Sequence, residues 1–338
     1  MVFVETLKDL GEFGFIRRVS RGCTVREEGV VLGVGDDAAA LEPSPGELLL
    51  VTTDLLVEGI HFRRAWTTGL QLGHKALAVN LSDIAAMGGT AREAFVSLAV
   101  PQDTETAFLD DLYEGMKALA QAYGLNILGG DTTGSSEGLV INVTVLGRVP
   151  QREILTRSGA QAGDALLLVG NVGESRAGLR LLTSKRSEQA KGFEQLLKAH
   201  LEPTPLLKEG RFLAISGAVH ACIDVSDGLS SDLGHMTEAS GVGARLFREA
   251  IPISENLSAY CAKERLDPID FALAGGEDYA LLVAVASEAI DAFRSDCQNA
   301  MGEDFHVIGE VADTGGLELE EADGRTSPLS PTGWNHFG

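Results

Sequence analysis

An apolar helical stretch that contains a carboxylate constrains this chain more than any other feature. Over Gln71–Gly89 (QLGHKALAVNLSDIAAMGG), apolar side chains occupy every side of a helical wheel, which is typical of a buried helix. Asn80 and Asp83 are three positions apart and therefore share one face of that helix. An ionised carboxylate in apolar surroundings is costly unless it is paired or binds a metal. Backbone amides or Lys75 could satisfy Asp83, or Asp83 could belong to a binding site, and the helix alone leaves both interpretations open.

The length and the hydrophobic content favour two domains. A chain of 338 residues, 44% of them hydrophobic, supplies material for more than one core. Strand and helix patterns follow one another in both halves, which predicts α/β domains. The apolar pattern lapses over Pro150–Gly163, so we place the boundary there and expect domains at 1–150 and 151–338.

Charge and cysteine usage exclude several classes of protein. There are 49 Asp and Glu against 27 Lys and Arg, a formal net charge of −22, which argues against nucleic-acid and anionic-membrane partners. An acidic protein that handles anions needs cations as intermediaries. The four cysteines have no CxxC or zinc-ligand spacing and are typical of reduced thiols. Charges such as Glu5 and Glu12 interrupt any signal-peptide core, and no uncharged run reaches the roughly 20 residues of a membrane span. We therefore expect a soluble, cytoplasmic protein.

Acidic residues follow five apolar or glycine-rich stretches. They are Asp36–Asp37 after Val30–Gly35, Asp54 with Thr52 and Thr53 after a buried-type strand from Leu48, Asp131 behind Gly129–Gly130, Asp224 and Asp227 after a strand from Ala218, and Glu277–Asp278 after a strand-like run from Phe271. Each one alone could be a solvated turn or a helix cap. Five of them together with Asp83 favour a common site, because ligands of α/β folds gather beyond the carboxyl ends of strands.

The ligand types select the metal and the class of ligand. Oxygen donors without converging His or Cys favour Mg²⁺, and several carboxylates indicate more than one ion. Several Mg²⁺ ions in a glycine-lined site suit a nucleoside triphosphate. The chain has no GxxxxGK[ST] sequence and no kinase HRD or DFG motif, so the usual phosphate-binding architectures are excluded.

Seven motifs in a fixed order connect the chain to a known family. They are GVGDDAA, TTDLLVEGIHF, KALAVNLSDIAAMGG, GGDTTG, LTRSGA, DVSDGLSSDLGH and GGEDYALL. In this order they resemble the thiamine-monophosphate kinases, whose broader relatives are aminoimidazole ribonucleotide synthetase, selenophosphate synthetase and hydrogenase-maturation proteins. The HF pair at the end of the second motif and the terminal GWNHF favour the thiamine enzymes. No cysteine near Gly33 or after Phe337 points to the selenophosphate or hydrogenase-maturation type.

The resemblance implies a fold, an activity and a set of ligands. It implies two α/β (α+β) domains of the aminoimidazole ribonucleotide synthetase-like fold, with mixed sheets and packed helices, and a homodimer built through N-terminal strands. It implies ATP-dependent phosphorylation of thiamine monophosphate to thiamine diphosphate, the last step of thiamine diphosphate biosynthesis. The implied Mg²⁺ ligands are Asp37, Thr52, Thr53, Asp54, Asp83, Asp131, Asp224 and Asp227. The implied ATP contacts are Tyr113, Gly130, Asp131, Arg157 and Ser226, and the implied thiamine monophosphate contacts are His61, Glu277 and Trp334.

This chemistry explains why no acid–base pair stands out. The accepting phosphate oxygen is already ionised at neutral pH, so no general base is required, and the obstacle is to bring two polyanions together. Arg157 would neutralise charge on the transferring phosphate. Trp334 would stack on thiamine or only anchor the tail, and His61 could equally be structural. A different ATP-dependent enzyme of the same fold and a non-catalytic Mg–nucleotide-binding protein remain as alternatives.

Overall fold

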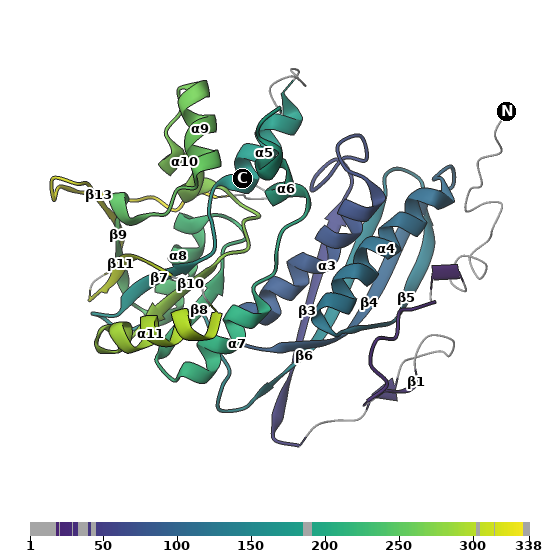
Figure 1. Ribbon diagram of the computed structural model, residues 1–338, viewed down its shortest axis with the longest axis horizontal. Helices are drawn as coiled ribbons and strands as arrows, with labels where there is room; N and C mark the ends of the chain where they lie inside the picture. Colours follow the sequence, from purple (N-terminus) through teal and green to yellow (C-terminus); the bar gives the residue numbers. More distant parts are fainter. Residues whose placement is uncertain are drawn as a thin grey trace. The chain divides into compact units, whose positions relative to one another are not determined.

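The chain forms two compact units. The computed structural model describes residues 18–19, 21–28, 30–32, 40–41, 45–184, 191–301, 305–313 and 315–333 (Figure 1). Unit 1 comprises Met1–Ile84 and Thr90–Gln151, and unit 2 comprises Ala85–Gly89 and Arg152–Gly338. The end of the apolar helix thus belongs to unit 2, which no sequence pattern indicated.

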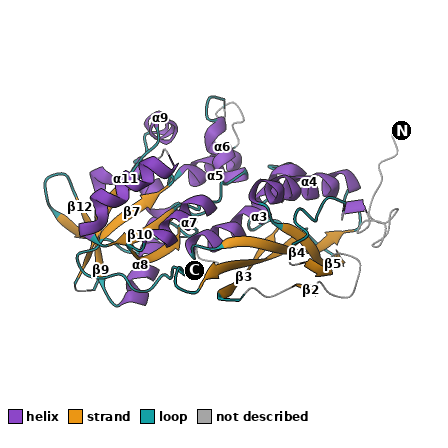
Figure 2. Cartoon of the chain, turned by 60° about the horizontal axis from the view of Figure 1, so that its bottom comes forward, coloured by secondary structure: helices purple, strands orange, loops and turns teal. Residues whose placement is uncertain are grey.

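Unit 1 is a four-stranded sheet with two helices on one face. The strand order is β3-β6-β4-β5, with β4 and β5 parallel and the other pairs antiparallel. Its strands are β3 (Glu47–Val57), β4 (Thr90–Pro101), β5 (Asn126–Ser135) and β6 (Val140–Pro150), beside a small ladder of β1 (Val30–Leu32) and β2 (Ala40–Leu41). Its helices are α3 (Gly69–Ala86) and α4 (Thr106–Tyr123). Figure 2 shows α3 and α4 side by side over this sheet.

The predicted buried helix is confirmed. Helix α3 ends at Ala86, and Gly88, with φ +67°, follows in the left-handed conformation that often ends a helix. Leu77, Leu81 and Ile84 are fully buried. The sheet and α4 cover this helix from two sides, which explains why its sequence is apolar all around.

Strand β3 is not the buried-type strand that its sequence predicted. It lies at one edge of the sheet. The Thr52 side chain meets Asp83 of α3, so the odd-numbered side chains of this strand point to the face opposite the helices. Leu49, Val51 and Leu55 on this face are 62%, 61% and 52% exposed. A continuous apolar run therefore marks a strand with an exposed apolar side, which a sequence cannot distinguish from a strand buried on both sides.

Unit 2 is a seven-stranded sheet covered by helices. The strand order is β13-β12-β9-β11-β7-β10-β8, antiparallel except for the β9–β12 pair. The strands are β7 (Ala165–Val169), β8 (Val219–Asp224), β9 (Gly243–Phe247), β10 (Leu281–Val285), β11 (His306–Ala312), β12 (Leu317–Glu320) and β13 (Thr326–Pro328). The helices are α5 (Glu174–Thr183), α6 (Glu194–Leu201), α7 (Leu207–Ser216), α8 (Leu229–Ser240), α9 (Glu255–Glu264), α10 (Pro268–Ala274) and α11 (Ile290–Met301), with 3₁₀ turns η2 (Arg248–Ala250) and η3 (Ser287–Ala289). Every residue of β7 and β10 is buried, because helices lie on both faces of the sheet (Figure 2).

Two local predictions in this unit are wrong. The run from Phe271 before the Gly pair is the end of helix α10 and not a strand; Asp267 caps that helix by accepting the Ile269 N–H, and Pro268 fixes its first turn. The EPTP sequence at Glu202–Pro205 predicts a helix that starts there with a proline in its first turn, whereas helix α7 begins only at Leu207. The helix predicted over Thr6–Val19 lies mostly outside the described residues. In the described part of the chain, no helix combines the length and apolar character that crossing a membrane requires.

Candidate functional site

Two carboxylates meet between β3 and α3. The register of the sheet points Thr52 and Asp54 to its helix-covered face, because their partners Val145 and Val143 are buried there. From α3, Asp83 accepts a hydrogen bond from Thr52 Oγ1. Burial, and then the neighbouring Asp83 carboxylate, raise the pKa of Asp54 to about 7. Unit 1 therefore has a pair of acids whose mutual repulsion a cation would relieve.

The other predicted metal ligands of unit 1 lie elsewhere on the sheet. Thr53 points to the opposite face, where its Oγ1 accepts hydrogen bonds from Asn142 Nδ2 at 2.9 Å and Thr144 Oγ1 at 3.0 Å. Asp131 is exposed on β5, at the edge opposite β3, with two strands between them. Three strand spacings amount to roughly 14 Å. Thr52, Asp54 and Asp83 thus come together, whereas Thr53 and Asp131 do not join them.

Asp54 and Asp131 lie within strands and not beyond their ends, since β3 continues to Val57 and β5 to Ser135.

Gly130, beside Asp131, is required by the fold itself. Its φ is +150°, and a Cβ at this position would lie 1.7 Å from the Val96 carbonyl oxygen of β4. The glycine therefore allows the parallel strands to pair, whatever it does for a ligand.

His61 and Tyr113 are held by the fold itself. The turn after β3 is closed by the Val57 N–H, which donates to His61 Nδ1 at 3.0 Å. Tyr113 is buried on α4, and burial raises the pKa of its hydroxyl. Further along the segment from His61, the Arg63 guanidinium lies over the ring of Trp66, 5.1 Å from the ring centroid. The ligand contacts of His61 and Tyr113 stay predictions.

Three loops of unit 2 meet at one end of its sheet. Leu281, the first residue of β10, pairs with Asp224 at the end of β8 and with Val169 at the end of β7. The antiparallel order therefore places the segment before β10 beside the segments after β7 and β8. The Glu277 N–H donates to the Ser226 carbonyl at 2.7 Å, and the Tyr279 N–H donates to the Val225 carbonyl at 2.8 Å.

The segment around Asp278 has a strained backbone. Glu277 and Tyr279 have φ values of +64° and +54°, which non-glycine residues rarely adopt. Asp278 lies between them and accepts N–H groups of Gly173 at 2.6 Å and Ser175 at 3.1 Å, at the start of α5. Burial outweighs these hydrogen bonds and raises the pKa of Asp278 to about 8.

A cavity of about 430 Å³ adjoins this segment. Its lining mixes polar and apolar residues, and its charged members are Glu174, Lys198, Glu202 and Asp278. The volume lies within the range of small-molecule sites in proteins. Sequence reasoning assigned no role to Asp278, although its position beside Glu277 in the GGED motif was a signal.

Asp227 is part of a group that could hold a metal. Ligand atoms of Asp227, Asp232 and His235 all lie within 4.8 Å of one another. Asp232 accepts the N–H groups of Asp227 at 3.1 Å and Gly228 at 3.0 Å, and burial raises its pKa to about 6. The sequence prediction included Asp227 alone; the spacing of Asp232 and His235, three residues apart on one helix, was the signal that it missed.

The remaining predicted residues are placed as follows. Asp224 is buried at the end of β8, and Arg157 is exposed in the connection before β7. Asp37 and Trp334 lie outside the described residues. The last described residue, Gly333, lies against the Asp227 turn, since a Cβ on it would be 2.7 Å from the Asp227 carbonyl oxygen.

Comparison with known proteins identifies the family. Models for AIR synthase related protein match residues 35–149 with the N-terminal domain and residues 161–321 with the C-terminal domain. The chain is 36% identical over 331 residues to the thiamine-monophosphate kinase of Aquifex aeolicus, covering 98% of this chain and 99% of that one.

Solved structures agree with this family assignment. The thiamine-monophosphate kinase from Stenotrophomonas maltophilia K279a is 35% identical with a TM-score of 0.81, covering 94% of this chain and 98% of the other. The structure of AaThiL complexed with AMPPCP and TMP is 35% identical with a TM-score of 0.77, covering 99% and 100%. The predicted two-domain α/β fold is confirmed, and the chain belongs to the thiamine-monophosphate kinase family of AIR synthase related proteins.

Proposed function

We propose that this protein transfers a phosphoryl group from ATP to thiamine monophosphate, giving thiamine diphosphate and ADP with the help of Mg²⁺. Within a chain of this family, the observation that carries the proposal is the meeting of Asp54 and Asp83. Burial and the neighbouring Asp83 carboxylate raise the pKa of Asp54, which marks a place that disfavours two free negative charges. A divalent cation with a bound polyphosphate would supply the positive charge that these two carboxylates need.

The donor set fits Mg²⁺. Carboxylate and hydroxyl oxygens are its preferred protein ligands, and Thr52 adds a hydroxyl beside the two acids. We propose Asp54, Asp83 and Thr52 as the central holders, with Asp37, Asp131, Asp224 and Asp227 as ligands of further Mg²⁺ ions; Thr53, whose side chain points to the opposite face of the sheet, is not among them. When bound, Mg²⁺ reduces the repulsion between the two phosphate groups and orients them for transfer.

The protein groups then bind, orient and shield the reactants. Gly130 and Asp131 on β5, Tyr113, Arg157 and Ser226 are proposed for ATP, and the guanidinium of Arg157 would neutralise phosphate charge. His61, Glu277 and Trp334 are proposed for thiamine monophosphate. In support, the Glu277 N–H donates to the Ser226 carbonyl. This hydrogen bond holds a residue proposed for thiamine monophosphate beside a residue proposed for ATP.

The cysteines support direct transfer without a covalent enzyme intermediate. All four thiols are buried, and burial raises the pKa of Cys23 and of Cys261 to about 11. Such thiols are poor nucleophiles at neutral pH. The accepting phosphate oxygen needs no general base, whereas the alcohol of unphosphorylated thiamine would need one.

The assembly and the compartment are parts of the same proposal. The exposed apolar side chains of β3 (Leu49, Val51 and Leu55) would be covered by the same strand of a second copy, giving a homodimer through N-terminal strands. We place the nucleotide-binding and dimerisation functions in residues 1–150 and a second α/β domain in 151–338. Reduced cysteines and the overall charge favour a cytoplasmic protein.

The experiment is to incubate the purified protein with ATP, Mg²⁺ and thiamine monophosphate and to separate the products by chromatography. We expect equal amounts of thiamine diphosphate and ADP, intersecting initial-rate plots, no trapped phosphoenzyme and little product from thiamine itself. ADP without thiamine diphosphate would instead identify another ATP-dependent enzyme of this fold. Nucleotide binding without either product would identify a binding protein.

A further inference from the structure

A fully buried serine holds the end of the described chain against α8. Ser230, in the first turn of α8, is 0% exposed, and its Oγ accepts the Thr332 N–H at 3.0 Å. The same Oγ lies 2.9 Å from two carbonyl oxygens, that of Thr332 and that of Leu273 in the last turn of α10. A hydroxyl has one proton and donates to one of them at a time. Ser230 therefore holds Thr332 through its N–H, whichever carbonyl receives the proton.

These hydrogen bonds differ from those of most serines near a helix start. Such a hydroxyl commonly bonds the backbone of its own helix, whereas the partners of Ser230 lie 43 and 102 positions further along the chain. Gly234, four residues after Ser230, lies on the same face of α8, and a Cβ at this glycine would be 3.4 Å from Pro331 Cγ. Pro331 and Thr332 therefore lie along one face of α8.

Two glycines contact the same carbonyl oxygen just before α8. A Cβ on Gly333 would lie 2.7 Å from the Asp227 carbonyl oxygen, and a Cβ on Gly276 would lie 3.3 Å from it. The residues that follow these glycines are Trp334 and Glu277, which are both proposed for thiamine monophosphate. Consecutive Cα atoms are about 3.8 Å apart. Both proposed substrate residues thus follow directly from points of the chain that touch Asp227.

We infer that Ser230 is a positioning residue, which holds the tail at Gly333 so that Trp334 meets thiamine monophosphate beside Glu277. Because Ser230 is fully buried, it acts through the tail and does not touch the substrate. Without the hydroxyl, the exposed Thr332 would bond water, and binding of the substrate would have to order the tail at a cost in affinity. The inference rests on the proposed function and adds a residue to it.

The test removes the anchor in two independent ways. Ser230→Ala deletes the hydroxyl, and Gly333→Ala adds a Cβ for which the Asp227 carbonyl leaves no room. We expect each to raise the KM for thiamine monophosphate about fivefold, as loss of one hydrogen bond would. The KM for ATP should stay within about twofold, although Ser226, which is proposed for ATP, lies close to Ser230 in the sequence.

Two matched controls and one double variant separate positioning from a structural role. Thr237→Val removes another buried hydroxyl of α8, which bonds the Gly234 carbonyl of the same helix at 3.0 Å. Gly315→Ala adds a methyl group where, among the described residues beyond its chain neighbours, no atom lies within 4 Å. Both controls should leave both constants unchanged. In a Trp334→Ala background, Ser230→Ala should add nothing to the KM for thiamine monophosphate, because the residue through which it acts is gone.

A binding measurement gives a readout that does not depend on turnover. The chain has two tryptophans, so in a Trp66→Phe background the tryptophan fluorescence comes from Trp334. Titration with thiamine monophosphate should change this fluorescence, and Ser230→Ala should raise the dissociation constant about fivefold. If Ser230→Ala does not fold, Gly333→Ala takes its place, since this glycine is exposed in the tail.

Equal rises in both Michaelis constants would place the effect in the turn of Ser226 and Asp227 and overturn the inference. Additive effects in the double variant, unchanged constants in Gly333→Ala, or a Trp334 signal that thiamine monophosphate does not alter would also overturn it. A wild-type protein that makes no thiamine diphosphate would refute the proposed function and this inference with it. An active wild type whose Ser230 and Gly333 variants match it would refute the inference alone.

Discussion

Replacing Asp83 by Asn tests the organising carboxylate of α3. Asn keeps the size of the side chain and an oxygen that can accept the hydrogen bond from the Thr52 hydroxyl, so the fold should persist. One negative charge beside Asp54 disappears. Without metal, the variant should be at least as stable as the wild type, because the Asp83 carboxylate is one of the causes that disfavour ionised Asp54.

With Mg²⁺ the order should reverse. At a concentration about 100 times the dissociation constant, Mg²⁺ stabilises the wild type by about 2.7 kcal/mol. If the lost ligand weakens binding about 100-fold, the same concentration stabilises the variant by only about 0.4 kcal/mol. For a unit of this size, roughly 3 °C per kcal/mol converts these values to shifts of about 8 °C and 1 °C. Turnover should fall at least about 100-fold, as when an electrostatic stabiliser is removed.

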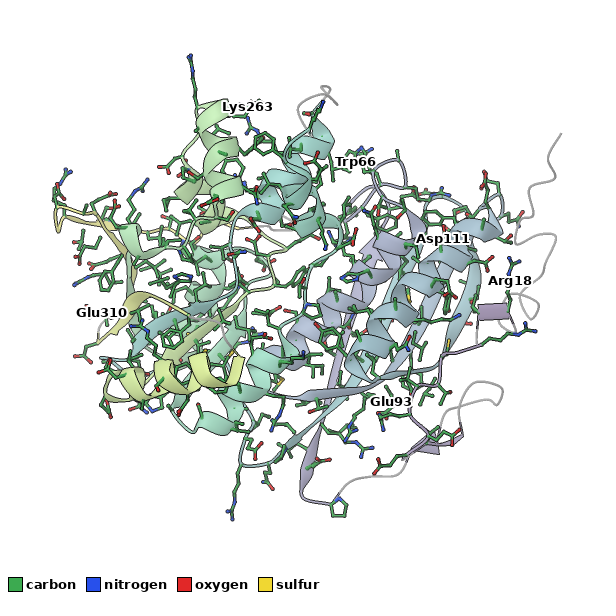
Figure 3. All side chains as sticks on the ribbon, viewed as in Figure 1. Arg18, Trp66, Glu93, Asp111, Lys263 and Glu310 are labelled. Atoms are coloured by element: carbon green, nitrogen blue, oxygen red, sulfur yellow. The ribbon has the colours of Figure 1, made fainter. Side chains whose placement is uncertain are left out.

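The assay is thermal unfolding in chelator and in excess Mg²⁺, together with the product assay, on purified variants. Asp111→Asn is the matched control: this exposed aspartate of α4 (Figure 3) loses the same charge away from the cluster and should respond to Mg²⁺ like the wild type. An Asp83→Asn protein with full activity and the wild-type Mg²⁺ shift would refute the metal role. A variant that is already destabilised in chelator would show that the carboxylate is structural.

Three further predictions concern the tail, the outer face of β3 and the segment before β10. Trp334→Ala should raise the KM for thiamine monophosphate well above that of Trp334→Phe while sparing the KM for ATP; equal effects on both constants would make the residue a tail anchor. Val51→Glu should convert a dimer to a monomer in light scattering, because it places a charge on an apolar side chain that is 61% exposed, and a mass equal to the wild type would contradict the proposed interface. Asp278 should make the folded protein less stable as pH rises from about 4 to about 8: the carboxyl ionises near its ordinary pKa of 3.8 in the unfolded chain, whereas burial raises its pKa to about 8 in the folded protein. Chemical denaturation across this range should show a steeper loss for the wild type than for Asp278→Asn, by up to about 1.4 kcal/mol per pH unit, and parallel curves would show that Asp278 is ionised in the fold.

Local patterns predicted the elements that carry most of the site. The apolar helix over Gln71–Gly89 (α3) and the strand from Ala218 (β8) are confirmed, because each pattern reflects the burial of its own segment. The same logic failed before the GGED motif. There the aspartate–proline start of α10 was a stronger signal than the short apolar run from Phe271, since Pro268 fixes a helical first turn.

The exposed apolar side of β3 shows what such patterns cannot predict, namely which face of a strand is covered. Alternate residues of one strand face opposite sides of a sheet, and only the position of α3 and α4 decides which side is covered. Leu49 and Leu50 are equally apolar in sequence, yet Leu49 is 62% exposed and Leu50 is buried.

By itself, the sequence determined the family and the two-domain α/β class, and it predicted oxygen ligands and the acidic residues that provide them. Only the tertiary structure decided which of those residues meet. It joins Thr52, Asp54 and Asp83 and separates Asp131 from them by the width of a sheet. The physical reason is that proximity between distant residues depends on strand order and helix packing. Those are set by burial across the whole unit, and no short stretch of sequence encodes them.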